Sequence, residues 1–93
     1  MEIEFDPAKD LANREKRGVS LQFAARVLAD PNRLVDLDTR RDYGEERSIC
    51  FGAVDRRLYV AVFPQRHGRC RILSVRKAND REAGHYLAHS RGE

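Results

Sequence analysis

The sequence predicts an α+β fold, with a small, mainly antiparallel β-sheet meander, two N-terminal helices and a C-terminal helix. Three observations lead to this prediction. The predicted elements run in the order strand, helix, helix, several strands, helix. Two segments before residue 31 have apolar residues at helical spacing, and the most continuous apolar run, Leu58–Phe63, has the length of a buried strand. We expect the helices to cover one face of the sheet and leave the other face open for binding.

The first strand and helix have well-marked boundaries. Residues 2–5 alternate between acidic and apolar side chains, as in a short strand. Asp6 offers an N-cap acceptor, and Pro7 suits the first position of a helix. Cations gather before Gly18, which can adopt the left-handed conformation that ends many helices. The sequence therefore predicts a helix from Pro7 to the residue before Gly18.

A second helix should begin at Ser20. Apolar residues recur at i, i+3, i+4 and i+7 from Leu21, and Asp30-Pro31-Asn32 stops the pattern. Residues 33–38 then form a candidate strand, followed by a polar loop over residues 39–45.

The next segments predict a three-stranded meander. Its strands span residues 47–54, 57–65 and 69–75, with a short connection at Asp55-Arg56. The strand over residues 57–65 is the most apolar, so it should lie centrally with both faces buried. Asn79 should cap a last helix, with Ala83, Tyr86 and Leu87 on its apolar side.

Length and composition fit one soluble domain over residues 1–93. The chain is 41% hydrophobic and 35% charged, which is ordinary for a globular protein. No apolar run approaches the roughly 20 residues of a membrane span, and the first five residues lack the features of a signal peptide. We therefore expect a cytoplasmic protein with no membrane partner.

The two cysteines favour buried thiols. Cys50 and Cys70 lie in apolar strand patterns without metal-ligand spacing, and the meander should place them two strands apart. Neither a disulfide nor a structural zinc site is expected.

Charge divides the chain in two. Residues 1–46 have 8 Lys and Arg against 11 Asp and Glu, a balance of −3, whereas residues 47–93 have 10 against 4, a balance of +6. The run 66–77 alone has five cations and no acidic residue. Arginine suits bidentate contact with phosphate, so this run indicates a surface for a polyanion. A strand edge charged against aggregation would look similar.

Three pieces of the sequence resemble the BrnT family of type II toxin–antitoxin systems. Taken in order they are Phe5-Asp6-Pro7-Ala8-Lys9 with Asn13-Arg14-Glu15-Lys16-Arg17-Gly18-Val19-Ser20, then Gly44-Glu45-Glu46-Arg47 with Gly52, then Arg71-Ile72-Leu73-Ser74-Val75-Arg76-Lys77-Ala78 with Glu82 and Tyr86. The resemblance spans roughly residues 3–86. Arg17 stands where the family usually has a histidine, which puts any proton-transfer role at that position in doubt.

The resemblance implies a bacterial endoribonuclease toxin with a RelE-like fold and no cofactor. Such a toxin cuts RNA until its cognate antitoxin, BrnA, binds and silences it. The pair would contact DNA only through the antitoxin.

Metal-free RNA cleavage sets chemical requirements that the residues can be tested against. The 2′-hydroxyl attacks the neighbouring phosphate, so the site needs a proton acceptor, cations for the developing charge and a donor for the leaving oxygen. The chain is rich in cations and poor in clear acids and bases. We expect the catalytic residues to be Lys16, Glu46, Arg47 and Arg76.

Three further residues are candidates for RNA binding. Arg71 and Lys77 belong to the basic run, and Tyr43 lies in the long loop, where its ring could stack on a base. In a regular strand Arg71 and Arg76 would point to opposite faces unless the strand ends or bulges near Val75. Tyr59 and Tyr86 are expected to pack instead.

Two other functions remain open. The same shape and charge suit a non-catalytic nucleic-acid-binding module, or a protein-interaction module that docks an acidic chain. His85 and His89 have the spacing of two metal ligands on a helix, but no third ligand is evident and no metal is expected.

Overall fold

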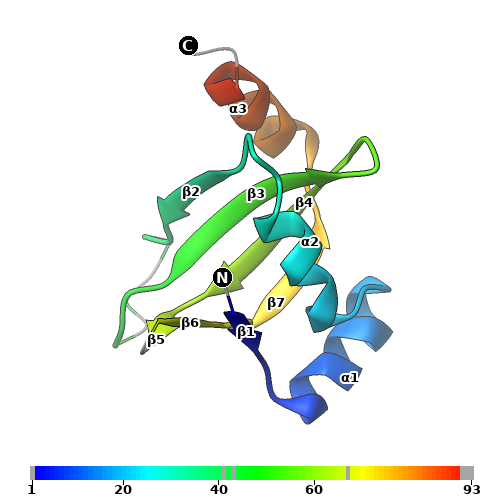
Figure 1. Ribbon diagram of the computed structural model, residues 1–93, viewed down its shortest axis with the longest axis vertical. Helices are drawn as coiled ribbons and strands as arrows, with labels where there is room; N and C mark the ends of the chain where they lie inside the picture. The colour runs from blue at the N-terminus through cyan, green and yellow to red at the C-terminus, as the bar shows by residue number, and fades with distance from the viewer. Residues whose placement is uncertain (1, 41, 43, 67, 91–93) are drawn as a thin grey trace.

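The computed structural model describes residues 2–40, 42, 44–66 and 68–90. It confirms a mixed α+β architecture with mainly antiparallel strands (Figure 1). The helical elements are α1 (Pro7–Arg17), the short 3₁₀ helix η1 (Leu21–Phe23), α2 (Ala24–Leu28) and α3 (Asp80–Ser90). The strands are β1 (Glu2–Glu4), β2 (Leu34–Leu37), β3 (Ser48–Val54), β4 (Arg57–Phe63), β5 (Gln65–Arg66), β6 (Arg69–Arg71) and β7 (Ser74–Lys77).

The strands form two sheets. The larger sheet has the order β2-β3-β4-β7, and each neighbouring pair is antiparallel. The smaller sheet has the order β1-β6-β5, with β1 parallel to β6. As predicted, β4 lies between two other strands of the meander, and Val60 and Ala61, on opposite faces, are both fully buried.

The prediction of one basic strand over residues 69–75 is wrong. The run breaks at Ile72-Leu73, so β6 and β7 belong to different sheets. The Ile72 N–H donates to Glu4 O at 2.8 Å, whereas the Leu73 N–H donates to Val62 O at 2.8 Å. Adjacent residues thus bond to different strands, and the chain changes sheet between them.

The central strand is also shorter than predicted. It ends at Phe63 instead of continuing to residue 65, because Pro64 follows and has no N–H for the ladder. The chain then enters the smaller sheet as β5.

The helix boundaries agree with the expected caps. The Asp6 side chain accepts a hydrogen bond from the Ala8 N–H at 2.9 Å. At the other end Gly18 has φ 75°, and its N–H donates to Arg14 O at 2.9 Å. The segment after Ser20 begins as the 3₁₀ helix η1 before it continues as α2.

The main core lies between α2 and the larger sheet. It includes Leu21, Val27, Cys50 and Val75, each fully buried. Gly52 on β3 permits this packing, because a Cβ there would lie 2.2 Å from the Val27 carbonyl oxygen. The backbones of α2 and β3 therefore approach closely at a position where only glycine fits.

A second cluster lies on the opposite face of the larger sheet. Ile49, Phe51, Val60 and Val62 form it, and Tyr86 of α3 packs against them. The expectation that all helices share one face is therefore wrong for α3. None of the residues of α3 is fully buried, so polar contacts have a large part in seating it.

Both cysteines are buried thiols, as expected. Burial raises the pKa of Cys50 to about 11. The predicted two-strand separation is wrong, because Cys70 lies in β6 of the smaller sheet and packs in the same core cluster as Cys50.

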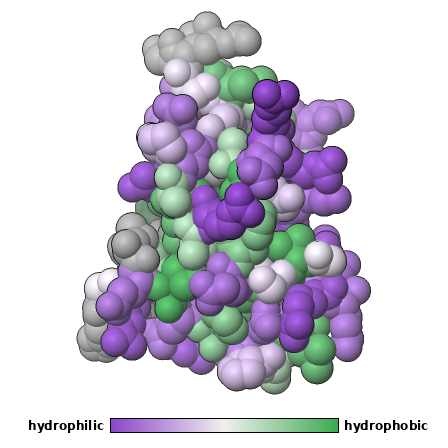
Figure 2. Space-filling model, turned by 45° about the vertical axis from the view of Figure 1, so that its right-hand side comes forward, coloured by the Kyte–Doolittle hydropathy of each residue, from purple (hydrophilic) through white to green (hydrophobic). Residues whose placement is uncertain are grey.

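One side of the molecule has a mainly polar surface. Figure 2 shows one side on which hydrophilic residues dominate and hydrophobic residues form small patches between them. No helix in the described part of the chain is long and apolar enough to cross a membrane.

Candidate functional site

The register of the larger sheet places Arg76 on the face that α3 covers. Leu34, Phe51, Val60 and Arg76 are direct partners from strand to strand across the sheet. Directly opposite residues project to the same face. The guanidinium of Arg76 therefore emerges at the β7 end of a row whose other members are apolar.

A buried asparagine holds β7 in place. The Asn13 side chain of α1 donates to Val75 O at 2.9 Å and accepts from the Val75 N–H at 3.3 Å. It also donates to Val19 O at 2.8 Å. The outer edge of β7 is thus closed at the residue next to Arg76 by an amide that imitates a neighbouring strand.

Arg76 and Glu82 form a bidentate ion pair. The two terminal guanidinium nitrogens lie 2.7 and 2.8 Å from the two carboxylate oxygens. This pairing raises the pKa of Arg76 and lowers the pKa of Glu82. With side chains only 22% and 16% exposed, the pair is partly shielded from water.

Glu82 also caps α3. Its carboxylate accepts from the Asn79 N–H at 2.9 Å, and the Asn79 side chain accepts from the Glu82 N–H at 2.8 Å. This reciprocal arrangement is a capping box. One carboxylate therefore fixes both the start of the helix and the orientation of Arg76.

Tyr86 provides the second anchor of α3. Its hydroxyl donates to the buried carboxylate of Asp30, which also accepts from the Ala53 N–H at 2.8 Å. Burial raises the pKa of Asp30, but these hydrogen bonds outweigh it and the pKa falls below 3.8. Burial and the contact with Asp30 together raise the pKa of Tyr86 to about 12.

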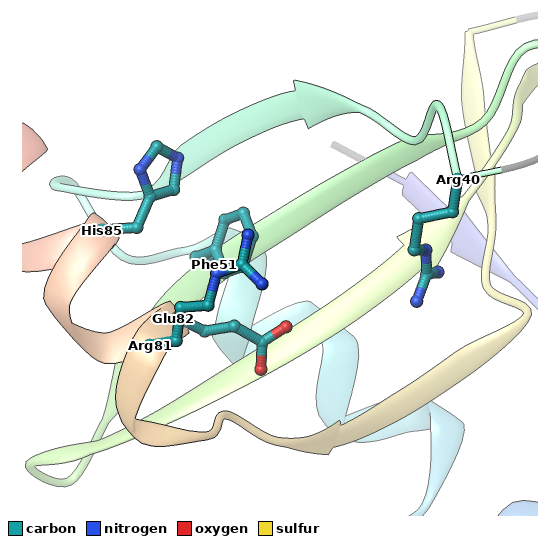
Figure 3. A pocket seen from close by; sticks show the side chains of 5 residues that line it. All are labelled: Arg40, Phe51, Arg81, Glu82 and His85. Carbon is teal, nitrogen blue, oxygen red and sulfur yellow. The ribbon is translucent and has the colours of Figure 1, made fainter.

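Between these anchors, α3 and the sheet enclose a pocket of about 440 Å³. Figure 3 shows Arg81, Glu82 and His85 projecting from α3 beside Phe51 of β3, with Arg40 on the opposite side. The Arg40 guanidinium is held by Asp38, with nitrogen–oxygen distances of 2.8 and 2.7 Å. The pocket thus combines two arginines, a carboxylate, an imidazole and an aromatic ring.

His85 lies at the rim of the pocket. Its Nε2 is 3.0 Å from Asp36 Oδ2, and its ring meets Phe51 edge-on with centroids 5.6 Å apart. The side chain is 54% exposed, so water or a bound ligand can reach it. Histidine beside a carboxylate is a common proton-transfer arrangement.

The structure does not bring the four predicted catalytic residues together. Lys16 and Arg17 line a separate pocket of about 260 Å³ beside Leu73 and Ser74. Glu46 and Arg47 line another of about 400 Å³ near the end of β2. Of the four, Arg76 is the residue paired with a member of the α3 pocket.

The predicted RNA-binding residues are also dispersed. Arg71 is in β6, where it lies 3.5 Å from the carboxylate of Glu4. Lys77 is exposed. It lies directly opposite Tyr59 in the β4–β7 register, on the face of the sheet opposite to Arg76. Tyr43 lies outside the described residues.

Sequence reasoning missed the pocket and most of its lining. Arg40 fell in a loop predicted only to be polar, and Arg81 and His85 depend on where α3 packs. The spacing of Asn79 and Glu82 was a usable signal, since it matches a capping box. Among the described residues, no three His, Cys, Asp or Glu side chains gather as a metal site would need.

The chemistry of this pocket suits a phosphate ester. Arg40 and Arg81 can hold a phosphate from two sides, and His85 can donate or accept a proton. Phe51 supplies an apolar wall of the pocket.

A comparison with protein families agrees with this chemistry. The family model described as "Ribonuclease toxin, BrnT, of type II toxin-antitoxin system" matches residues 5–82 of the 93-residue chain. The chain therefore belongs to the BrnT family of type II ribonuclease toxins, which implies an RNA target and a protein antitoxin. No curated protein sequence matches the chain.

Proposed function

We propose that this member of the BrnT family is an endoribonuclease that cuts RNA without a metal, in the pocket between α3 and the larger sheet. The observation that carries the proposal is the meeting of Arg40, Arg81 and His85 around one cavity. The scissile phosphate would lie between the two guanidinium groups, and the neighbouring 2′-hydroxyl would attack it.

The proton transfers and the stabilisation of charge can each be assigned to a group. His85, oriented by Asp36, accepts the proton of the attacking 2′-hydroxyl, and water donates the proton that the leaving 5′-oxygen takes up. The arginines stabilise the extra negative charge of the phosphorane. The products are a 2′,3′-cyclic phosphate and a free 5′-hydroxyl, so DNA, which lacks the 2′-hydroxyl, is not cut.

Arg76 and Glu82 act together in this proposal. Their ion pair fixes the wall of the pocket from which Arg81 and His85 project. Lys16, Lys77 and Arg71 lie away from the pocket and would contact the phosphate backbone of a longer RNA. Glu46 and Arg47 lie near the end of β2 and are not given a catalytic step.

The partner and setting belong to the same proposal. A BrnA-like antitoxin would inhibit the enzyme in the cytoplasm, and DNA would be contacted through that antitoxin. A RelE-like fold is proposed from the antiparallel sheet and its flanking helices, and superposition on solved ribonuclease toxins would test it.

The decisive experiment is cleavage of a labelled RNA by the purified chain in the presence of EDTA. We expect cyclic-phosphate products, and no cleavage of a substrate with 2′-deoxyribose at the cut site. His85→Ala should lower kcat by about 100-fold or more, the usual contribution of general acid–base catalysis. Arg81→Ala and Arg40→Ala should slow cleavage as well.

His89→Ala is the matched control, because His89 is exposed on the same helix and does not line the pocket. Its activity should equal that of the wild type. An RNA that is bound but left intact would favour a non-catalytic binding module. Cleavage that EDTA abolishes, or that ignores the 2′-deoxy substitution, would reject the mechanism.

A further inference from the structure

The outer edge of β2 presents unsatisfied backbone groups. The Asp38 N–H donates to Arg47 O at 2.8 Å, and these residues are directly opposite in the β2–β3 register. Hydrogen-bonded pairs alternate along an antiparallel ladder, so Val35 and Leu37 direct their N–H and C=O groups away from β3. Within the described residues, no hydrogen bond is made to those outward groups.

The side chains at the same two positions are exposed and apolar. Val35 is 48% exposed and Leu37 is 59% exposed. They project to the face that α2 covers further along the sheet, but they lie beyond the helix. An apolar edge strand with free backbone groups is a template for pairing with another chain.

Charge restricts what can pair there. Residues 34–46 contain five acidic residues, Asp36, Asp38, Asp42, Glu45 and Glu46, and two arginines, Arg40 and Arg41. This balance disfavours a polyanion as the chain that pairs with the outer edge of β2. A basic protein segment would be attracted.

A second copy of this chain fits poorly. A symmetric pairing that uses the edge groups of both Val35 and Leu37 is centred on Asp36, so it sets Asp36 directly opposite the same residue of the other copy. Like charges in that position destabilise a strand pair. The acidic loop residues of the two copies would add to the repulsion.

We propose that β2 is the docking edge for an extended segment of the antitoxin, which adds to the larger sheet as a fifth strand. The segment would place apolar side chains beside Val35 and Leu37, with a lysine or arginine between them facing Asp36. The proposal rests on the toxin role of the family, and it does not depend on which residues cut RNA.

Strand addition at β2 would also affect the α3 pocket. Asp36 and Asp38, which hold His85 and Arg40, are both at this edge. A cation facing Asp36 would compete with His85 for the carboxylate. Docking at β2 would therefore disturb the pocket as well as attach the partner.

The test measures binding to the protein encoded by the reading frame that adjoins this gene. Leu37→Asp adds a charge to the exposed edge, and Val35→Pro removes an outward N–H that the fold does not use. Each should weaken the complex by about tenfold or more, equivalent to about 1.4 kcal/mol. In the wild-type complex, hydrogen exchange at Val35 and Leu37 should slow markedly.

Leu11→Asp is the matched control, because Leu11 is 52% exposed and lies on α1. It should bind the partner like the wild type, and thermal unfolding should show that all three variants are folded. Equal affinity of Leu37→Asp and wild type, or unchanged exchange at β2, would overturn the proposal. Slowed exchange at β2 in the isolated protein at high concentration would overturn it in favour of self-pairing.

Failure of the proposed enzyme activity would be seen separately. If the wild type leaves RNA intact while β2 is protected in the complex, the docking edge stands and the catalytic proposal falls. If free Leu37→Asp cuts RNA at the wild-type rate but still binds the partner fully, the reverse holds.

Discussion

The two edge strands of the larger sheet differ in whether their outward backbone groups are hydrogen-bonded. At β7 the side chain of Asn13 bonds both backbone groups of Val75, so that position has no free hydrogen-bonding groups. At β2 the equivalent groups of Val35 and Leu37 face outward beside exposed apolar side chains. The closed edge braces the fold beside Arg76, whereas the outward groups of the open edge are bonded to no other part of the described chain.

Removing the Asn13 side chain from the closed edge should have the largest effect on stability. Asn13→Ala leaves the Val75 N–H and C=O and the Val19 C=O without their partner, in a largely buried setting. Unfolding in urea should show that the free energy of unfolding falls by about 2–4 kcal/mol. Asn32→Ala, at an exposed asparagine, should change stability by less than about 0.5 kcal/mol. Similar values for the two variants would contradict the bracing role of Asn13.

Loss of the Arg76–Glu82 ion pair, next to the closed edge, should have the second-largest effect on stability. Glu82→Gln replaces a charge-assisted bidentate contact and should cost about 1–2 kcal/mol at neutral pH. The pKa of Glu82 is lowered from 4.5 in the fold, so its contribution is present above that pH and is lost as the pH falls through the folded value. Denaturation from pH 7 to pH 2 should therefore show a smaller acid loss in Glu82→Gln than in wild type. Identical pH profiles would show that Arg76 does not stabilise the carboxylate.

A substitution in the hairpin between β3 and β4 should raise stability instead of lowering it. Asp55 and Arg56 have φ 51° and 67°, the left-handed region that favours glycine. Arg56→Gly should raise the midpoint of thermal unfolding and stabilise the fold by about 0.5–1 kcal/mol. Arg57→Gly, one residue on and inside β4, should destabilise it by about the same amount. A loss of stability in Arg56→Gly would mean that the arginine side chain stabilises the turn.

The smallest effect on stability is expected at the open edge. Leu37→Lys substitutes a side chain that is already 59% exposed, so unfolding in urea should change by less than about 0.5 kcal/mol. Sedimentation at high concentration should show no greater self-association than wild type, since lysine discourages edge pairing. A loss comparable to that of Asn13→Ala would show that β2 is already part of the packed core.

Local signals predicted most of the elements. Asp6, Pro7 and Gly18 marked α1 because capping depends on neighbouring residues alone. The continuous apolar run predicted a central strand, and β4 has that place. The break at Ile72-Leu73 was not visible, because it depends on Glu4 and Val62, which lie far away in the sequence.

The candidate site was less predictable than the fold. Arg76 stands out in the sequence because it belongs to a basic run, whereas its partner Glu82 stands out only as part of a family motif. The pocket requires α3 to cross the sheet face, and the contact of Tyr86 with Asp30 that seats it spans 56 residues. Pairings of that range are set by tertiary packing, which local sequence patterns do not specify.

The parallel pairing of β1 with β6 has a consequence for the order of folding. Glu2 pairs with Arg69, which lies 67 residues later in the sequence. Strand β1 therefore cannot pair until β6 has been synthesised, and closing so long a loop slows the formation of the smaller sheet. A nascent chain that ends before β6 lacks the smaller sheet entirely, so β1 stays unpaired while α1, α2 and the β3–β4 hairpin are synthesised.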